Sequence, residues 1–405
     1  MKIALIHYTA PPVVGGVESA LARQAAQLAQ AGHLVTILAG RGETWNARYP
    51  VRVLPRIDPR HPEVLNFRAE LEDGSLPEGF RALVQHLESD LREALSGCEA
   101  VIAHNVASLH RNLALTAALY NIAQSPRAPR MILWHHDLAW AMPRFQGELY
   151  PGWPWDLLRT PWGGARQVVT SQLRREQLMQ IFGLPEEEIA VIPTGLEMPE
   201  FLGLQPRSAK LVRDLHLLEA APILLTPVRI SRHKNLEMAL RVLAELRREM
   251  PQAALVVTGP PASSHAASLD YFHSLLKLRD ELDLRGSAHF LAEFAAQGLT
   301  DAEVPDYFRL ADALLLPSRE EGFGTPVLEA GLAGLPVFCS ELPALRALAG
   351  GCATYFSVDE EPRVVARLVA RRLQSNSVYQ LRVSVRQSYT AEALYQRWIV
   401  PLLEP

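Results

Sequence analysis

The residues whose types and spacing are best suited to bind a ligand lie between positions 317 and 330. An apolar run, Ala313 to Leu316, directly precedes them and has the length of a buried strand. Thr325 can cap a helix and Pro326 suits its first turn, so we expect a loop that joins the carboxyl end of a strand to a helix start. The unpaired N–H groups and partial positive charge of a helix start favour an anion.

Two glycines and two carboxylates narrow the ligand chemistry of this stretch. Gly322 and Gly324 let a ligand approach the backbone closely. Glu321 precedes the turn and Glu329 lies one turn inside the helix, where a carboxylate is better suited to accept hydrogen bonds from hydroxyl groups than to contact an anion. Sugar hydroxyls fit this requirement. Taken alone, both glutamates would more often be solvated side chains.

A second candidate site follows the apolar run from Pro222 to Val228. Arg229 and Lys234 lie five positions apart in the loop that leads to the next helix. They can converge on one pair of phosphates, the arginine as a fork and the lysine as a point charge. The alternative is two ordinary solvated residues.

Gly15 and Gly16 stand before a helix start, after the first expected strand, where open α/β sheets bind ligands. A plain tight turn explains the pair equally well, and the spacing of a dinucleotide fold is absent.

A histidine pair follows the expected strand from Arg130 to Trp134. Adjacent residues of a strand point to opposite faces, so at most one of His135 and His136 enters a cleft. For the same reason a metal site built from these histidines and Asp137 is not favoured.

Strands and helices alternate along the whole chain, which predicts α/β domains with parallel sheets. We place one domain at 1–198, with a C-terminal segment 391–405 that returns to it, and a second at 199–390. Between 41 and 89 the pattern is less regular, with prolines that mark loops, and function is not readable there. The expected elements include strands at 2–8, 34–39, 100–103, 130–134, 167–171, 189–192, 222–228, 254–259, 288–291, 313–316 and 352–356, and helices at 17–31, 80–95, 265–284, 301–312, 361–374 and 391–403.

The 317–337 segment resembles the donor-site signature of glycosyltransferase family 4. Its two glutamates are separated by seven residues around a Gly-Phe-Gly turn, and a small-residue helix and a Gly-Leu-Pro-Val sequence follow. Thr325 stands where the family usually has an apolar residue, and Val228 where it usually has glycine.

The resemblance covers essentially the whole length and implies the GT-B fold, in which two Rossmann-like domains face each other across a cleft. It implies that Arg229 and Lys234 bind the diphosphate, that Glu321 and His136 hold the sugar and that Glu329 binds the ribose. It assigns the remaining donor contacts to Gly15, Gly16, Gly322, Phe323, Gly324 and Thr325.

The implied activity is a retaining transfer of a hexosyl group from a UDP- or GDP-sugar to an acceptor hydroxyl. We expect no cofactor and no metal, because two cations and a helix start can stabilise the leaving diphosphate. The alternatives are a nucleotide-sugar 2-epimerase of the same fold, a phosphorylase-like enzyme that carries pyridoxal phosphate on a lysine, and a non-catalytic sugar-nucleotide binding protein. The acceptor, whether carbohydrate, lipid-linked or a small metabolite, the donor base and the oligomeric state stay open.

Five of the seven tryptophans lie between positions 134 and 162. We expect Trp140, Trp153 and Trp155 to shape the acceptor side of the cleft, since tryptophan can stack on sugar rings. Contact with a membrane interface and simple packing of a long loop are the alternatives.

Composition indicates a globular protein, with 48% hydrophobic and 21% charged residues among 405. A formal charge of −4 argues against a nucleic-acid binder. We expect a cytoplasmic enzyme with its three cysteines, Cys98, Cys339 and Cys352, reduced in the core. A peripheral contact at the inner membrane face stays open, without a dense basic patch to favour it.

Overall fold

The computed structural model describes residues 1–71, 74–261, 266–294 and 298–404. The chain divides into two compact units: Met1–Leu196 together with Ala391–Pro405, and Glu197–Thr390. The first division falls after Leu196, two positions before the boundary placed from the sequence. We describe each unit by itself.

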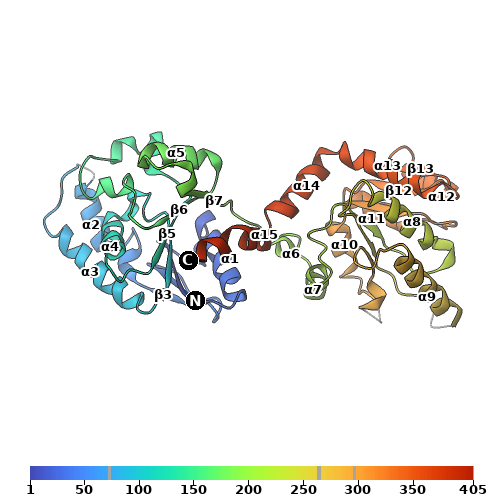
Figure 1. Ribbon diagram of the computed structural model, residues 1–405, viewed down its shortest axis with the longest axis horizontal. Coiled ribbons are helices and arrows are strands. Elements are labelled where there is room, and N and C mark those ends of the chain that lie inside the picture. Colours follow the sequence, from blue (N-terminus) through green and yellow to red (C-terminus); the bar gives the residue numbers. More distant parts are fainter. Residues whose placement is uncertain (72–73, 262–265, 295–297, 405) are drawn as a thin grey trace. The chain divides into compact units, whose positions relative to one another are not determined.

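The first unit is built on a parallel sheet whose strands run in the order β3-β2-β1-β4-β5-β6-β7 (Figure 1). All of its strand pairs are parallel, so each connection must cross over the sheet. The strands are β1 Lys2–Ile6, β2 Leu34–Ala39, β3 Val51–Val53, β4 Ala100–His104, β5 Arg130–His135, β6 Arg166–Val169 and β7 Ile189–Val191.

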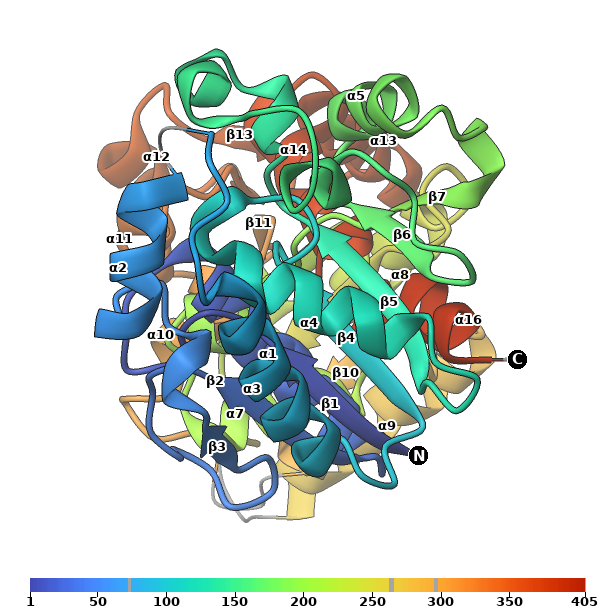
Figure 2. The same cartoon turned by 90° about the vertical axis from the view of Figure 1, so that its left-hand side faces the viewer.

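Helices cover both faces of this sheet. Side chains alternate along β1: Ala4 and Ile6 pack against α3 and α4, whereas Ile3 and Leu5 pack against α1. Figure 2 shows α3 and α4 lying over one face. The helices are α1 Gly16–Gln30, α2 Pro62–Leu71, α3 Phe80–Ala94, α4 Leu113–Ala123 and α5 Gln172–Phe182, with short 3-10 turns at Pro55–Ile57, His110–Asn112, Ala139–Ala141, Pro143–Glu148, Trp155–Leu158 and Glu186–Glu188.

The C-terminal segment packs on the α1 face of the first unit. It comprises α15 (Ala391–Leu394), a π-helical stretch (Tyr395–Ile399) and α16 (Val400–Leu403). Tyr395 and Ile399 are buried in the core of that face. The Tyr395 hydroxyl lies 3.1 Å from His33 Nε2, and Arg130 donates to the carbonyl of Glu404 at 2.9 Å. The expected single helix is therefore interrupted by a π turn.

The second unit has a parallel sheet in the order β10-β9-β8-β11-β12-β13, with one continuous hydrophobic core. Its strands are β8 Ile223–Thr226, β9 Ala254–Val257, β10 Ala288–Phe290, β11 Ala313–Leu316, β12 Val337–Ser340 and β13 Thr354–Phe356. Its helices are α6 Met198–Phe201, α7 Pro206–Asp214, α8 Leu236–Leu246, α9 Ala266–Glu281, α10 Val304–Leu310, α11 Thr325–Leu332, α12 Pro343–Ala349, α13 Pro362–Gln374 and α14 Ser377–Ser388, with 3-10 turns at Arg232–Lys234 and Leu291–Glu293.

Both sheets have the strand order of a Rossmann-like domain, in which the first strand lies between the second and the fourth. In the first unit this places β1 beside β4, and in the second unit β8 beside β11. The direction of winding reverses at these two positions, which leaves a crevice at the carboxyl ends of the strands. The prediction of two Rossmann-like domains with parallel sheets is confirmed.

Several local expectations were wrong. Thr325 does not cap α11: Gly324 occupies the N-cap position and Thr325 is the first helical residue, with no side-chain capping bond. Cys352 is exposed and Cys98 only half-buried, whereas Cys339 lies in the core. The expected 301–312 helix is shorter, because Pro305 starts a helix at its first turn rather than allowing an earlier one. His265, the expected start of α9, lies outside the described residues.

Candidate functional site

The strongest candidate site lies where β8 and β11 end side by side. Lys234 Nζ is 2.6 Å from Glu321 Oε1, and both side chains are largely buried. The Ser318 hydroxyl donates to the same Glu321 oxygen at 2.8 Å. The two loops are also joined through their backbones, since Arg319 N–H donates to the carbonyl of His233 at 2.7 Å. Two segments 87 residues apart in sequence thus form one charged cluster.

Arg229 lies at the carboxyl end of β8, in the same loop as Lys234. Its side chain is exposed and makes no hydrogen bond or ion pair with the residues that the structure describes. The backbone at Arg229 packs closely on Gly259, where an added Cβ would come within 2.2 Å of the Val228 carbonyl oxygen. Gly259 therefore sets the position of the Arg229 loop. The sequence analysis assigned it no role, although a glycine at a strand end was visible.

The start of α11 lies beside this cluster in the chain. Gly324 has φ = 96°, in the left-handed region, and an added Cβ would lie 2.4 Å from Leu345 Cδ2. Both observations require glycine at this position. Gly322 has open space around its Cα, while Phe323 and Thr325 are exposed. Pro326 has no N–H, and the Val327 N–H donates to the Gly324 carbonyl at 2.9 Å.

Glu329 lies one turn inside α11, as the sequence predicted. Its carboxylate has no hydrogen-bond partner within the described ranges. Partial burial raises the pKa of Glu329. The two carboxylates therefore differ in their hydrogen bonds. Glu321 accepts from Lys234 and Ser318, whereas both oxygens of Glu329 can accept hydrogen bonds from a ligand.

In the first unit, Gly15 and Gly16 open α1 at the carboxyl end of β1. Gly15 is the N-cap residue, and an added Cβ would lie 2.0 Å from the Glu18 carboxylate. Glu18 accepts a 2.5 Å hydrogen bond from the Thr9 hydroxyl and lies 3.8 Å from His7 Nε2. The sequence analysis did not single out Glu18 or its contacts with residues after β1.

The two adjacent histidines occupy different environments, as their alternation predicted. His135 is fully buried, with Nε2 2.9 Å from Gln167 Oε1. His136 lies instead beside His104 at the end of β4, with His136 Nε2 and His104 Nδ1 3.0 Å apart. Both His104 and His136 line a pocket of about 420 Å³, its open mouth included, beside α1 and the C-terminal segment.

The protonation state of His136 follows from this neighbourhood. Burial, together with the nearby imidazoles of His7 and His135, lowers the pKa of His136 to about 3, so the ring is neutral at pH 7. His104 Nε2 donates to Gln24 Oε1 at 2.9 Å, which makes its Nδ1 an acceptor and His136 Nε2–H the donor. His136 is left with Nδ1 as a hydrogen-bond acceptor.

Asn105 positions the segment that carries His136. Its side-chain oxygen accepts hydrogen bonds from the backbone N–H groups of His136, at 2.8 Å, and Asp137, at 3.2 Å. Asn105 itself is buried and has φ = 61°, a conformation that asparagine adopts more readily than most residues. The sequence analysis did not single it out, because a strand-end asparagine has no signal of its own.

The three predicted acceptor-side tryptophans are half-buried or buried. Trp155 is 3% exposed and belongs to the core of the first unit. Trp153 packs edge-on against Phe80, and the Arg159 guanidinium lies 4.5 Å above the Trp140 ring. Packing, the alternative left open by the sequence, accounts for all of these contacts.

The described residues offer neither a metal centre nor a membrane-spanning helix. No group of three or more His, Cys, Asp or Glu side chains among them could hold a metal ion. No helix among them is long and apolar enough to cross a membrane.

Comparison with known proteins gives two family matches. Residues 14–198 match the model of Glycosyltransferase Family 4, and residues 209–386 match that of Glycosyl transferases group 1. Each match falls almost entirely within one unit.

Similar curated proteins include the D-inositol 3-phosphate glycosyltransferase of Kineococcus radiotolerans, 31% identical over 45% of this chain and 40% of that protein. The GDP-mannose-dependent alpha-(1-6)-phosphatidylinositol monomannoside mannosyltransferase of Mycolicibacterium smegmatis is 25% identical over 47% and 46%. These alignments span less than half of the relatives' length. Among solved structures, HepE of Anabaena in complex with UDP is 16% identical over 99% of both chains, with a TM-score of 0.36. With both halves matched by glycosyltransferase models and the predicted signature in the second half, the chain belongs to glycosyltransferase family 4.

Proposed function

We propose that the protein is a retaining glycosyltransferase that transfers a hexosyl group from a nucleoside diphosphate sugar to an acceptor hydroxyl. The observation that carries this proposal is the cluster where β8 and β11 end side by side, in which Lys234 and Ser318 both bind Glu321. Arg229 and the start of α11 belong to the loops that follow the same two strands. Two cations, a helix start and hydroxyl-accepting carboxylates are the groups that a sugar diphosphate requires.

The diphosphate is bound by Arg229, Lys234 and the N–H groups at the start of α11. Arg229 has no anionic partner among the described residues, so its charge is available. Lys234 is paired with Glu321 and would turn part of its hydrogen-bonding capacity to the ligand, since an ammonium group has three donors. Glu321 then accepts a sugar hydroxyl, and Glu329 accepts the ribose hydroxyls.

His136 accepts a hydrogen bond from a hydroxyl of the donor sugar through Nδ1. A neutral imidazole suits this role, because Nε2–H is already committed to His104. The family resemblance assigns Gly15 and Gly16 to the donor as well, and Gly16 has open space around its Cα.

In the reaction, the bond between the anomeric carbon and the diphosphate oxygen breaks, and a bond to the acceptor oxygen forms on the same face. The acceptor proton moves to the departing phosphate, so the protein need not supply a base. Its contribution is to stabilise the charge that develops on the diphosphate, which Arg229 and Lys234 do without a metal ion.

A thermal-shift screen with UDP-, GDP- and ADP-sugars tests donor binding, since a ligand raises the apparent stability in proportion to the logarithm of its concentration over Kd. Nucleoside diphosphate release with and without acceptor, in buffer with EDTA, then tests transfer, and NMR of the product anomer tests retention. An altered free sugar released without acceptor would indicate the epimerase alternative. Binding without turnover over a broad acceptor panel would indicate a binding protein.

A further inference from the structure

Three histidine side chains, His7, His104 and His136, lie close together at the carboxyl ends of β1, β4 and β5. The rings of His104 and His136 stack, with centroids 5.3 Å apart and planes inclined by 28°. Burial lowers the pKa of all three, and a charge on one ring would disfavour a charge on its neighbours. At pH 7 each ring is therefore neutral and carries a single N–H.

A row of hydrogen-bonded neutral imidazoles has a direction. Each ring offers one donor and one acceptor, so the nitrogen that is protonated in one ring decides which nitrogen is protonated in the next. The row begins on α1, where Gln24 Oε1 accepts from His104 Nε2 at 2.9 Å. His104 Nδ1 then accepts from His136 Nε2 at 3.0 Å. Nδ1 of His136, at the far end, is an acceptor with no partner among the described residues.

The first two members of this row are held firmly enough to impose its direction. Gln24 is 5% exposed and His104 is 1% exposed, so water does not replace their hydrogen bond. The His104 ring also stacks on Trp134, with centroids 5.7 Å apart. His7 does not compete for the His104 ring, because His7 Nδ1 donates to the backbone carbonyl of His104 at 3.0 Å.

We propose that Gln24 and His104 are positioning residues that set the tautomer of His136, so that His136 selects a donor sugar with a hydroxyl group where it meets the ring. The tautomer is a property of the protein alone, whereas the choice of donor rests on the proposed function. A lone pair directed at the ligand accepts from a hydroxyl group but gains nothing from a group that only accepts, such as fluorine. Such a site disfavours the wrong ligand, because a polar group is left unpaired.

Nitrogen-15 NMR of the full chain with labelled histidine measures the tautomers directly, because protonated and unprotonated ring nitrogens differ widely in chemical shift. Each resonance is assigned by its loss in a single histidine variant. At pH 7 we expect the proton on Nε2 in both His104 and His136. A proton on Nδ1 of His136 in the wild type overturns the proposal, and this measurement needs neither a ligand nor a variant of Gln24.

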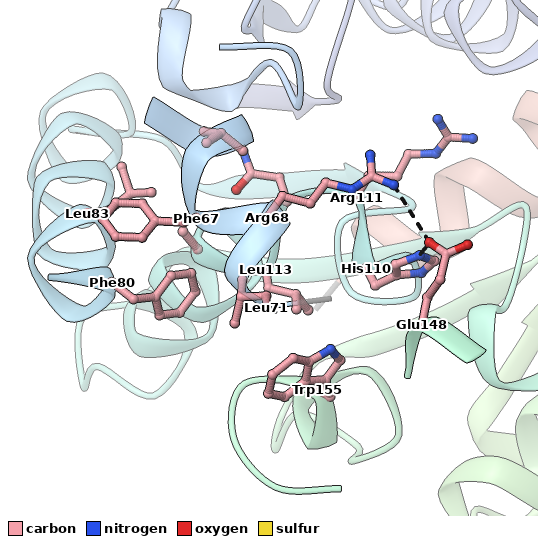
Figure 3. A pocket seen from close by; sticks show the side chains of 13 residues that line it. Phe67, Arg68, Leu71, Phe80, Leu83, His110, Arg111, Leu113, Glu148 and Trp155 are labelled. Atoms are coloured by element: carbon pink, nitrogen blue, oxygen red, sulfur yellow. Dashed lines mark hydrogen bonds and ion pairs between the residues drawn. The ribbon is translucent and has the colours of Figure 1, made fainter. Parts of the chain in front are cut away.

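Two other histidines of the first unit serve as references in the same spectrum. His7 carries its proton on Nδ1, since the carbonyl oxygen opposite can only accept. His110 carries its proton on Nε2, which lies 2.8 Å from a carboxylate oxygen of Glu148, as Figure 3 shows. His110 belongs to a pocket between α2, α3 and the start of α4, whose lining includes Phe67, Phe80 and Arg111 (Figure 3).

Gln24→Lys should reverse the row. An ammonium group only donates, so His104 Nε2 becomes an acceptor, His104 Nδ1 donates to His136, and His136 carries its proton on Nδ1. Gln27→Lys is the matched control: Gln27 lies three positions further along α1 and lines the same pocket, and its side-chain nitrogen has no partner in the described part of the chain. It should keep both tautomers.

A gentler variant covers the case in which Gln24→Lys does not fold. Gln24→Met keeps the size of the side chain but removes the acceptor of the buried His104 Nε2–H. The share of His136 with its proton on Nδ1 should therefore rise, since a buried donor without an acceptor is costly. An unchanged His136 tautomer in folded Gln24→Lys, or in Gln24→Met, contradicts the proposal.

Donor analogues test the consequence for specificity. Calorimetric titration without acceptor compares UDP-glucose and GDP-mannose with deoxyfluoro analogues, in which fluorine replaces one hydroxyl group at a time. In the wild type and in Gln27→Lys, the analogue that lacks the hydroxyl group at His136 should bind at least about tenfold more weakly than its parent. In Gln24→Lys the same analogue should lose less than about threefold, because the reversed His136 donates and has no hydroxyl proton to accept.

The outcomes separate this inference from the proposed function. Equal losses for every analogue in the wild type and in Gln24→Lys, with the tautomers as expected, would remove the role of the row in donor choice. Failure of both parent sugars to bind or turn over, with the tautomers as expected, would refute the proposed function for these donors and leave the positioning of His136 standing. Donor turnover with the opposite tautomer of His136 would refute the positioning and leave the proposed function standing.

Discussion

Lys234 and Glu321 form a largely buried ion pair, with Nζ 2.6 Å from Oε1, between the loops that follow β8 and β11. Both residues were predicted to contact the donor, and in the structure they neutralise each other. The pair holds together the loops that follow β8 and β11. Its second hydrogen bond, from Ser318, fixes which carboxylate oxygen is used.

Loss of the lysine alone is therefore expected to destabilise the fold as well as the reaction. Lys234→Met leaves the Glu321 carboxylate buried without a counter-ion and should lower the free energy of unfolding by about 3 to 5 kcal/mol. Lys234→Met combined with Glu321→Gln should recover most of that loss, without recovering turnover. Urea unfolding of the single and double variants measures the difference; equal stability of both would show that the pair is not coupled.

Replacement of Arg229 should lower turnover without lowering the stability of the fold. Its side chain is exposed and unpaired among the described residues, so Arg229→Ala should change the free energy of unfolding by less than about 0.5 kcal/mol. Turnover should fall by about 10² to 10³, because a charge-assisted contact to the leaving diphosphate is lost. Arg213→Ala, an exposed arginine on α7, serves as the control. Steady-state kinetics that match the wild type would exclude Arg229 from the site.

Gly322 and Gly324, in the turn that precedes α11, should differ in how much their replacement by alanine changes the free energy of unfolding. Gly324→Ala forces a Cβ into the left-handed region and against Leu345, and should lower the free energy of unfolding by about 1 to 3 kcal/mol. Gly322→Ala has open space and should leave stability unchanged. Chemical denaturation of the two variants provides the comparison, and equal effects would contradict the geometry of the turn.

Acid should destabilise the first unit through its buried histidines. Burial lowers the pKa of His135 to about 4 and that of His136 to about 3, below the ordinary value near 6.5 of the unfolded chain. Between these pKa values the unfolded state binds more protons than the folded state. The contribution of the neutral histidines to the free energy of unfolding is therefore complete above about pH 6.5 and is lost as the pH falls towards 4.

Each such histidine contributes at most about 1.4 kcal/mol per pH unit to the slope of unfolding free energy against pH. His135→Gln, whose side chain lies outside the proposed site, should reduce this slope between pH 4.5 and 6.5. Urea midpoints measured across that range test it, and an unchanged slope would mean that His135 titrates normally.

The sequence by itself determined the alternation of strand and helix, and with it two domains of parallel sheet. β2 and β11 were predicted to the residue, because short, largely apolar runs that end at glycine or proline are typical of buried strands. The donor turn was also predictable, since Gly324 and the flanking glutamates form a local pattern. The local cap was not: glycine took the N-cap position that Thr325 was expected to fill, because the turn requires a positive φ there.

Only the tertiary structure decided which residues act together. The contacts of Lys234 with Glu321, of Asn105 with the His136 backbone and of Gly259 with the Arg229 loop join segments far apart in sequence, and they arise because parallel strands bring their carboxyl ends to one edge. The pocket lined by Phe67, Phe80 and Arg111 was likewise invisible, since α2 lies in the region whose pattern is less regular and its burial depends on helices that pack against it. Local sequence specifies elements, whereas long-range packing specifies their neighbours, and the candidate chemistry depends on the neighbours.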